Sequence, residues 1–375
     1  MSEPDEQSPS QSILRLDPFA DEGRVREIWQ GLDAVLEQSF FLSWGWMAAW
    51  LATVSRTHNI QLISVLKEGT PTGAFFLGQR RGLRRGSLAR QRAYLNATGY
   101  PDYDEVTIEY NGAVERKGTG ALNCLFSSSQ FSHIEEFNFS AVTQESLDSL
   151  VLPTDFSMVS CRELPSYFVD LAAIRRSETD YLEWLSRNKR SQLRRSIALY
   201  EEQGSVQTVQ AESSAEALDM LSELRKLHEL RWAKRDNPGA FSSEPFMRFH
   251  HRLIESRFDS GEIQLLKIAN LGGTIGLLYN FVYNNEVLYY QSGFNYGDSN
   301  LLRPGLVCHH QAITHNLGLG RDCYNFLAGS SQFKKSLSTH RDNLYHIKVA
   351  RNSWKLKAER FLRQLRDAAR LGRSN

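Results

Sequence analysis

The residues whose types and spacing most clearly suggest a chemical role lie between a predicted aromatic strand and the helix that follows it. The strand ends in LYYQSGFN, a polar loop follows, and Arg303-Pro304-Gly305 opens the helix. A helix start has unpaired backbone N–H groups and a positive dipole end, so it attracts anions, and Arg303 adds a fixed charge. Pro304 suits a first turn, and Gly305 lets a ligand approach the backbone closely. The pattern predicts a pyrophosphate site at Arg303, Gly305, Leu306 and Val307, although a Pro-Gly pair also simply starts helices.

Motifs that would specify another chemistry are absent from the sequence. Neither GxxxxGK followed by Ser or Thr nor GxGxxG occurs, which excludes the Walker and dinucleotide-binding patterns. The four cysteines form no C-x-x-C pair and have no His at zinc-ligand spacing, so we expect neither a disulfide framework nor a metal site. No Ser-His-Asp signature requires a covalent enzyme intermediate.

The composition is that of a soluble protein with room for two domains. Of 375 residues, 41% are hydrophobic and 11% aromatic, which is enough apolar surface to offset the entropy of ordering the chain. The first twelve residues, MSEPDEQSPSQS, carry three acids and no apolar run, a pattern that argues against a secretory signal. We expect a disordered segment over residues 1–12 and a cytoplasmic location.

Positive charge is concentrated in the second half of the chain. Residues 1–150 hold 13 Lys and Arg against 19 Asp and Glu, whereas residues 151–375 hold 31 against 24. Two basic runs contribute much of the excess, one over residues 187–195 and one in a helix predicted over residues 351–375. Such runs are commonly solvated helix faces, and the alternative is an anion-binding surface. For the terminal helix we favour packing on its own domain over binding to an anionic membrane.

The elements that must position the anion site form hairpins followed by a helix and a strand. Strands are predicted at 263–269, 274–283 and 287–294, joined by Gly272-Gly273 and Asn284-Asn285, which are typical hairpin pairs. Upstream, periodicity and flanking turns predict further helices. The predicted helices of the second half lie at 177–203, 214–235, 244–258 and from 304 onward, with a strand at 323–327.

The first half repeats this order of elements, which indicates an internal duplication. Ile60, Gln61, Leu62, Gly69 and Gly73 match Ile263, Gln264, Leu265, Gly272 and Gly276 at one offset of 203 residues, 263 against 60. We therefore expect two mixed α/β domains, each built from helices, a strand meander and a further helix and strand. Gly120 and Asn123 stand where the second half has its anion loop, but neither Pro-Gly nor arginine precedes them.

Five stretches taken in order resemble the GNAT acetyltransferase superfamily, and in particular its CelD-like branch, which is linked to exopolysaccharide and cell-envelope synthesis. The resemblance extends to the FemABX-type aminoacyltransferases, which use aminoacyl-tRNA on the same tandem fold. It implies a mixed α+β fold of two tandem GNAT-like domains, each a mostly antiparallel mixed sheet flanked by helices. The stretches are SFFLSWGWMAAW, RNKRSQLRRSIALYEEQGSV, LHELRW, YYQSGFN with RPGLV, and YNFLAGSSQFKKS.

The resemblance also implies roles for individual residues. Lys334, with Gly329 permitting a close turn, matches a family lysine that contacts donor phosphate or the developing oxyanion. Arg231 and Trp232 in LHELRW match an acceptor-cleft position. Asp298, on the loop before Arg303, is the acid best placed to act as general base, with loop capping as the alternative.

On the aromatic strand, neighbouring residues point to opposite faces, so one of Tyr290 and Gln291 should line the cleft. We assign Gln291 to catalysis and Tyr290 to substrate binding. The neighbouring pair His309 and His310 is typical of one core and one surface position, because adjacent helical residues point about 100° apart.

We expect a first, non-catalytic GNAT-like domain over residues 13–160 and a second, donor-binding one over 161–350. The expected function is transfer of an acyl group from acyl-CoA or acyl-carrier protein to an amine or hydroxyl of a sugar or envelope precursor. Two alternatives stay open. One is a FemABX-like aminoacyltransferase that uses tRNA, and the other is a non-catalytic scaffold in polysaccharide assembly.

Overall fold

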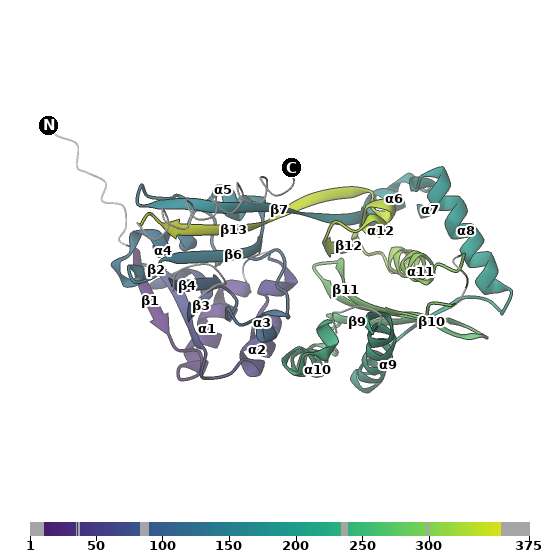
Figure 1. Cartoon of the computed structure of the whole chain (residues 1–375), viewed down its shortest axis with the longest axis horizontal. Coiled ribbons are helices and arrows are strands. Elements are labelled where there is room, and N and C mark those ends of the chain that lie inside the picture. Colours follow the sequence, from purple (N-terminus) through teal and green to yellow (C-terminus); the bar gives the residue numbers. More distant parts are fainter. Residues whose placement is uncertain are drawn as a thin grey trace, which may run out of the picture. The chain divides into compact units, whose positions relative to one another are not determined.

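A computed structural model describes residues 11–34, 36, 38–82, 90–233, 239–297, 299 and 301–353, which form two compact units (Figure 1). Unit 1 comprises Met1–Trp44, Val54–Glu163 and Leu344–Asn375, and unit 2 comprises Gly45–Thr53 and Leu164–Asn343. The chain passes between the units at both ends of Gly45–Thr53 and inside two long strands. These are β7 (Phe156–Asp170) and β13 (His340–Arg351).

The unit boundaries differ from the expected domains in two segments. Gly45–Thr53 belongs with unit 2, because the Trp46 ring packs with its centroid 4.7 Å from that of Phe249. The strand from Leu344 belongs with unit 1, because Ile347 pairs with Phe139 of that unit's sheet. The predicted terminal helix lies outside the described residues.

Unit 1 is a mixed sheet in the order β1-β2-β3-β4-β6-β13. Neighbouring strands are antiparallel except for the parallel pair β4–β6. Aromatic side chains, Phe126, Phe137, Phe139 and Phe156 among them, fill its core. The strands are β1 (Gln11–Leu16), β2 (Asn59–Lys67), β3 (Thr70–Gly82), β4 (Arg90–Leu95), β5 (Val114–Glu115) and β6 (Glu136–Val142). The helices are α1 (Glu22–Asp33), η1 (Phe40–Leu42), α3 (Pro101–Asp104), η2 (Ala121–Asn123), α4 (Cys124–Ser127), η3 (Ser129–Phe131) and α5 (Gln144–Asp148). Helix α2 (Trp44–Thr53) belongs to unit 2 except for its first residue.

Unit 2 has the matching order β8-β9-β10-β11-β12-β7, with β11–β12 as its parallel pair. In Figure 1, α9 and α10 lie on one face of its sheet and α11 on the other. The strands are β8 (Gln207–Gln210), β9 (Ile263–Asn270), β10 (Gly273–Tyr283), β11 (Glu286–Phe294) and β12 (Cys323–Ala328). The helices are α6 (Leu171–Ser177), α7 (Tyr181–Trp184), α8 (Arg187–Glu201), α9 (Ser214–Trp232), η4 (Ala240–Ser242), α10 (Glu244–Arg257), α11 (Pro304–Gly318) and α12 (Gln332–Leu337).

The two sheets share strand register as well as order. Lys67 pairs with Thr70 beside the turn of the first hairpin, as Asn270 pairs with Gly273 in the second. Each hairpin then has one unpaired extra residue at the equivalent place, Thr72 in β3 and Ile275 in β10. A shared bulge at a shared position supports the duplication inferred from sequence. The expected mixed α/β fold, with two similar sheets flanked by helices, is confirmed.

The single helix predicted over residues 177–203 is wrong, because local capping breaks it. Glu178 adopts a left-handed conformation (φ 52°) that ends α6, and the Asp180 side chain accepts a hydrogen bond from Leu182 N to begin α7. The Ser186 hydroxyl then caps Lys189 N and begins α8. The break places the basic helix α8 as a separate element beside α11.

Candidate functional site

The parallel strands β11 and β12 pair over only part of their length. The pairs run from Glu286–Cys323 to Leu288–Asn325, and beyond them β11 continues to Phe294 paired with β10 alone among the described strands. At that point β11 carries an extra residue, Tyr290, opposite the step from Tyr279 to Asn280 in β10. A bulge bends its strand, and bulges are over-represented beside active sites. The two strands therefore form a wedge that is closed at one end and open at the other.

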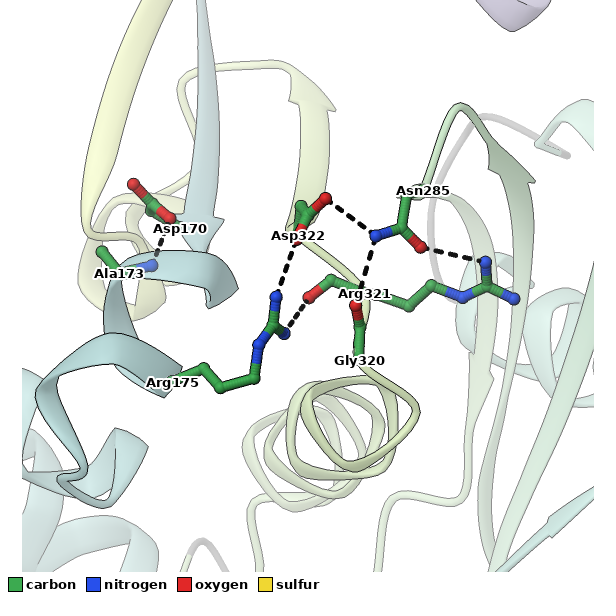
Figure 2. A network of polar contacts seen from close by, with 7 residues as sticks. All are labelled: Asp170, Ala173, Arg175, Asn285, Gly320, Arg321 and Asp322. Carbon is green, nitrogen blue, oxygen red and sulfur yellow. Dashed lines mark hydrogen bonds and ion pairs between the residues drawn. The ribbon is translucent and has the colours of Figure 1, made fainter.

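A polar network pins the closed end of the wedge (Figure 2). The Asp322 carboxylate accepts hydrogen bonds from Arg175 (2.7 Å) and from the Asn285 side chain (2.8 Å). Arg175 also donates to the Arg321 carbonyl, and Asn285 to that of Gly320. The network ties α6 and the β10–β11 turn to the start of β12.

Asp322→Asn is expected to lower the melting temperature in a pH-dependent way. Hydrogen bonds from Asn285 and Arg175 hold the pKa of the Asp322 carboxyl below its usual value. A lowered folded-state pKa stabilises the protein above the unfolded pKa of about 4, and this contribution is lost as the pH falls through the folded pKa. The difference in melting temperature between wild type and variant should be constant from pH 7 to about 5 and shrink below about 4. Asp259→Asn, an exposed carboxylate with no hydrogen bond among the described contacts, is the control, and a difference that persists unchanged to pH 3 would contradict the assignment.

At the open end lies a pocket of about 600 Å³. Its wall consists of the end of β11 and the loop after it, the first turns of α11, and the start of α12. Lys189 reaches it from α8 and Arg231 from α9. The remaining lining residues are Phe294, Tyr296, Gly297, Ser299, Leu302, Arg303, Pro304, Gly305, Leu306, His309, Gln332 and Phe333.

The pocket is electropositive. Lys189, Arg231 and Arg303 line it, and none of the lining residues that the structure describes is acidic. Burial, and next the nearby Arg303 cation, lower the pKa of Lys189. The Arg231 guanidinium lies 4.3 Å from the centroid of the Tyr296 ring, in cation–π geometry. An anionic ligand would relieve the repulsion between Lys189 and Arg303.

The start of α11 adds backbone polarity to this charge. No side chain caps the helix, and Arg303 N donates to the Ser196 hydroxyl at 3.0 Å. Leu306 N and Val307 N both donate to the Arg303 carbonyl. Gly305 N, which is also in the first turn, has no hydrogen-bond acceptor among the described residues. A Cβ at Gly305 would come within 3.3 Å of the Phe294 ring in the pocket, so glycine keeps this wall open. Phosphate binding needs such a donor beside fixed cations.

Three of the predicted donor residues meet in this pocket, namely Arg303, Gly305 and Leu306, and Arg231 joins them from the predicted acceptor group. Val307 is buried in the core behind them.

Trp232 packs beside His228, with ring centroids 5.6 Å apart. Tyr290 lies in an aromatic cluster with rings such as Phe281 and His250. Gln291 is half-buried opposite Tyr279, Gly329 and Lys334 lie at the end of β12 outside the lining, and Asp298 is outside the described residues.

Lys334 holds the end of β12. Its ammonium donates to the carbonyls of Ala328 (2.6 Å) and Leu327 (3.3 Å), while the neighbouring Phe333 lines the pocket. Gly329, at φ 135°, makes the turn between strand and helix, and its N donates to the Pro165 carbonyl at 2.9 Å. Lys334 therefore couples strand β12 to the pocket wall formed by α12.

Lys334→Ala is expected to reduce the free energy of unfolding by about 1.5–3 kcal/mol, the usual contribution of a hydrogen bond to a charged group. Donor affinity should fall with it, because the wall at Phe333 loses its anchor. Chemical denaturation and calorimetric titration measure the two effects. Lys335→Ala, at the exposed neighbouring position, is the control. If Lys334→Ala has the stability and the donor affinity of the wild type, Lys334 is an ordinary surface lysine and neither effect exists.

The equivalent helix start in unit 1 has an acidic side chain where α11 has Arg303. There the Glu115 carboxylate accepts a hydrogen bond from Ala121 N at 2.6 Å, so an acid occupies the helix start. Burial raises the pKa of Glu115. Gly118 and Gly120 both adopt positive φ, and the helical segment begins after them, at Ala121. A phosphate at this helix start would have to compete with the Glu115 carboxylate for the Ala121 N–H group.

Comparison with known proteins agrees with this topology. Residues 187–335 match the family model described as an acetyltransferase (GNAT) domain. This segment is similar to a GNAT-type domain. Among curated proteins, no sequence matches the chain.

Solved structures with a similar fold extend over nearly the whole chain. A crystal structure of FemX is 11% identical with a TM-score of 0.54, over 85% of this chain and 95% of that one. The C-terminal domain of a putative lysylphosphatidylglycerol synthetase from Agrobacterium fabrum is 12% identical with a TM-score of 0.53, over 91% and 95%. At these identities the likeness shows the fold alone. Among the described helices, none is both long and apolar enough to cross a membrane.

Proposed function

We propose that the protein is an acyltransferase that binds acyl-CoA, or the equivalent arm of an acyl-carrier protein, in the unit 2 pocket. One observation carries the proposal: three cations and an uncapped helix start surround a pocket at the open end of the β11–β12 wedge. The GNAT-type match of residues 187–335 supports an acyl-CoA donor. In this arrangement Arg303, Lys189 and Gly305 N would bind the donor's phosphates, and the splayed strands would admit its arm.

The proposed reaction is attack of an acceptor amine or hydroxyl on the donor's thioester carbonyl. The new C–N or C–O bond forms as the C–S bond breaks, and the acceptor's proton ends on the thiol or in solvent. The protein's part is to orient the two substrates and stabilise the developing oxyanion. Gln291 stays our proposal for a group near the reacting atoms and Asp298 for the general base, with Arg231, Trp232 and Tyr290 proposed for the acceptor side.

We further propose that the acceptor is a sugar or cell-envelope precursor, as the resemblance to the CelD-like branch implies, and that unit 1 does not bind donor. The Glu115 carboxylate at its helix start supports the second point. A non-catalytic scaffold would bind no donor in either unit, so donor binding separates the scaffold from the enzyme.

A second donor is favoured by the exposed face of α8. Arg187, Arg194 and Arg195 are exposed there and enter no ion pair among the described residues. A polyanion such as aminoacyl-tRNA could bind this face, as in the FemABX-like alternative. Such binding would weaken steeply with salt, because phosphate neutralisation releases counterions.

Calorimetric titration of the full chain with acetyl-CoA, a longer acyl-CoA, acyl-carrier protein and charged tRNA tests the proposal. We expect binding of the CoA donors with one site per chain. Binding of charged tRNA alone, with steep salt dependence, would establish the FemABX-like alternative. Binding of none would favour the scaffold.

A further inference from the structure

Among the polar residues that line the pocket, His309 is the most deeply buried, and we call its position the floor. The donor-binding proposal so far leaves it without a role. The residue lies on α11, one and a half turns past the helix start, and its side chain is fully buried. Aromatic rings enclose it, with Tyr289 edge-on at 4.5 Å between centroids and Phe333 stacked at 5.3 Å. Its Nε2 has no hydrogen-bond partner among the described residues. Buried polar atoms are rarely left unpaired, so this one needs an explanation.

The other ring nitrogen is already engaged. Nδ1 lies 3.2 Å from the hydroxyl of Tyr324, a residue of β12 that is itself fully buried. Burial, and next the Lys334 cation, lower the pKa of His309 to about 3, so the ring is neutral at physiological pH. Burial raises the pKa of Tyr324 well above its usual value, so the hydroxyl keeps its proton. No other acceptor for this hydroxyl is found among the described residues, so its proton is paired only if it donates to Nδ1. The ring's own proton then lies on Nε2.

We propose that His309 is a positioning residue whose Nε2–H donates a hydrogen bond to an uncharged carbonyl of the bound acyl donor. The inference rests on the proposed donor pocket and names the part of the ligand that its floor accepts. That part is an amide or thioester carbonyl on the donor's arm, beyond the phosphates held at Arg303 and Lys189.

The floor offers a neutral hydrogen-bond donor. The Nε2–H group, which lies among the rings of Phe333 and Tyr289, pairs with a carbonyl oxygen. An ammonium group would meet a donor instead of an acceptor, and the nearby Lys334 cation would repel it. The pocket thus offers fixed cations to phosphates and a neutral donor to a carbonyl.

A second buried histidine provides a matched control. In the aromatic cluster of unit 2, His250 is also fully buried, its Nδ1 lies 3.3 Å from the hydroxyl of Tyr279, and its Nε2 is likewise unpaired among the described residues. His250 does not line the pocket. Replacing either histidine by Phe removes the same two ring nitrogens and the same contact to a tyrosine hydroxyl, so only the place in the molecule differs.

The test uses two probes, acetyl-CoA and adenosine 3′,5′-bisphosphate, titrated into the full chain. His309→Phe should weaken acetyl-CoA binding about tenfold, because that is the usual effect of losing one hydrogen bond. The affinity for the bisphosphate, which has no carbonyl on an acyl arm, should not change. His309→Gln keeps an N–H donor and should recover part of the loss. Tyr324→Phe should show a smaller loss, because it removes only the group that fixes the tautomer. His250→Phe should bind both probes as wild type does.

A spectroscopic readout keeps the proposal testable if His309→Phe does not fold. In wild-type protein labelled with ¹⁵N-histidine, acetyl-CoA should shift the Nε2 resonance of His309 and leave that of His250 in place. Wild-type acetyl-CoA affinity in His309→Phe, equal loss of both probes, or an unmoved Nε2 resonance would overturn the inference while the donor pocket stands. If wild-type protein binds neither probe, the proposed function fails and the inference fails with it.

Discussion

Arg303→Glu is expected to weaken acyl-CoA binding by roughly 10- to 100-fold. A charged hydrogen bond contributes about 1.5–3 kcal/mol and each 1.4 kcal/mol is a factor of ten in Kd. The substitution also places a negative charge beside the donor's phosphates, next to Gly305 N and Lys189. Because the Arg303 side chain is exposed and only its backbone N bonds to Ser196, the fold should tolerate the change. Calorimetric titration with acetyl-CoA measures the effect.

Arg187→Glu provides the control for net charge. It makes the same change on the exposed face of α8, away from the pocket lining. If the pocket binds the phosphates, Arg303→Glu loses affinity and Arg187→Glu loses little, and the difference persists at higher salt. Equal Kd values for wild type and Arg303→Glu would place the donor elsewhere. Equal losses in the two variants would indicate long-range attraction instead of a site.

Local signals in the sequence were sufficient for two elements beside the site, the β10–β11 turn and the start of α11. Asn284 and Asn285 both adopt positive φ, 46° and 61°, in the tight turn predicted between β10 and β11. Asparagine tolerates this conformation, so the pair marks a hairpin without reference to the rest of the fold. The helix start at Pro304 was also predictable from one residue, because proline's fixed φ and missing N–H suit the first turn of a helix.

The shape of the site was not predictable, because it depends on pairing between distant strands. Alternation along β11 suggested that Tyr290 and Gln291 lie on opposite faces, but the extra residue at Tyr290 shifts the register between Tyr289 and Gln291. Nothing in a single strand marks such a bulge. The wedge depends in turn on how far β12 follows β11, which is a property of both strands.

Long-range contacts also decided which residues meet. The sequence placed Arg231 with the acceptor, and the end of α9 brings it beside Tyr296 into the lining of the pocket that we propose for the donor. One of His309 and His310 was expected to be a core residue, and His309 is fully buried. Only the three-dimensional arrangement shows that this core position also lines a pocket.

Gly293→Ala is expected to lower both stability and donor affinity, because this glycine sets how closely β11 approaches α9. A Cβ at Gly293 would lie 2.4 Å from the Leu224 carbonyl oxygen and 2.9 Å from the Leu227 Cβ. The first of these neighbours is backbone and cannot rotate away, so strand and helix must separate. Overpacking of this kind costs about 1–3 kcal/mol. The end of β11 supplies Phe294 to the pocket and α9 supplies Arg231, so their separation should weaken acetyl-CoA binding as well.

Gly318→Ala distinguishes this clash from the general effect of replacing glycine. A Cβ at Gly318, near the end of α11, would meet no atom within 4 Å, and an added methyl group there reduces only the freedom of the unfolded chain. Denaturation midpoints should therefore fall for Gly293→Ala and stay level or rise by the equivalent of about 0.4–1 kcal/mol for Gly318→Ala. A Gly293→Ala protein with wild-type midpoint and wild-type acetyl-CoA affinity would show that the α9–β11 spacing does not set the pocket.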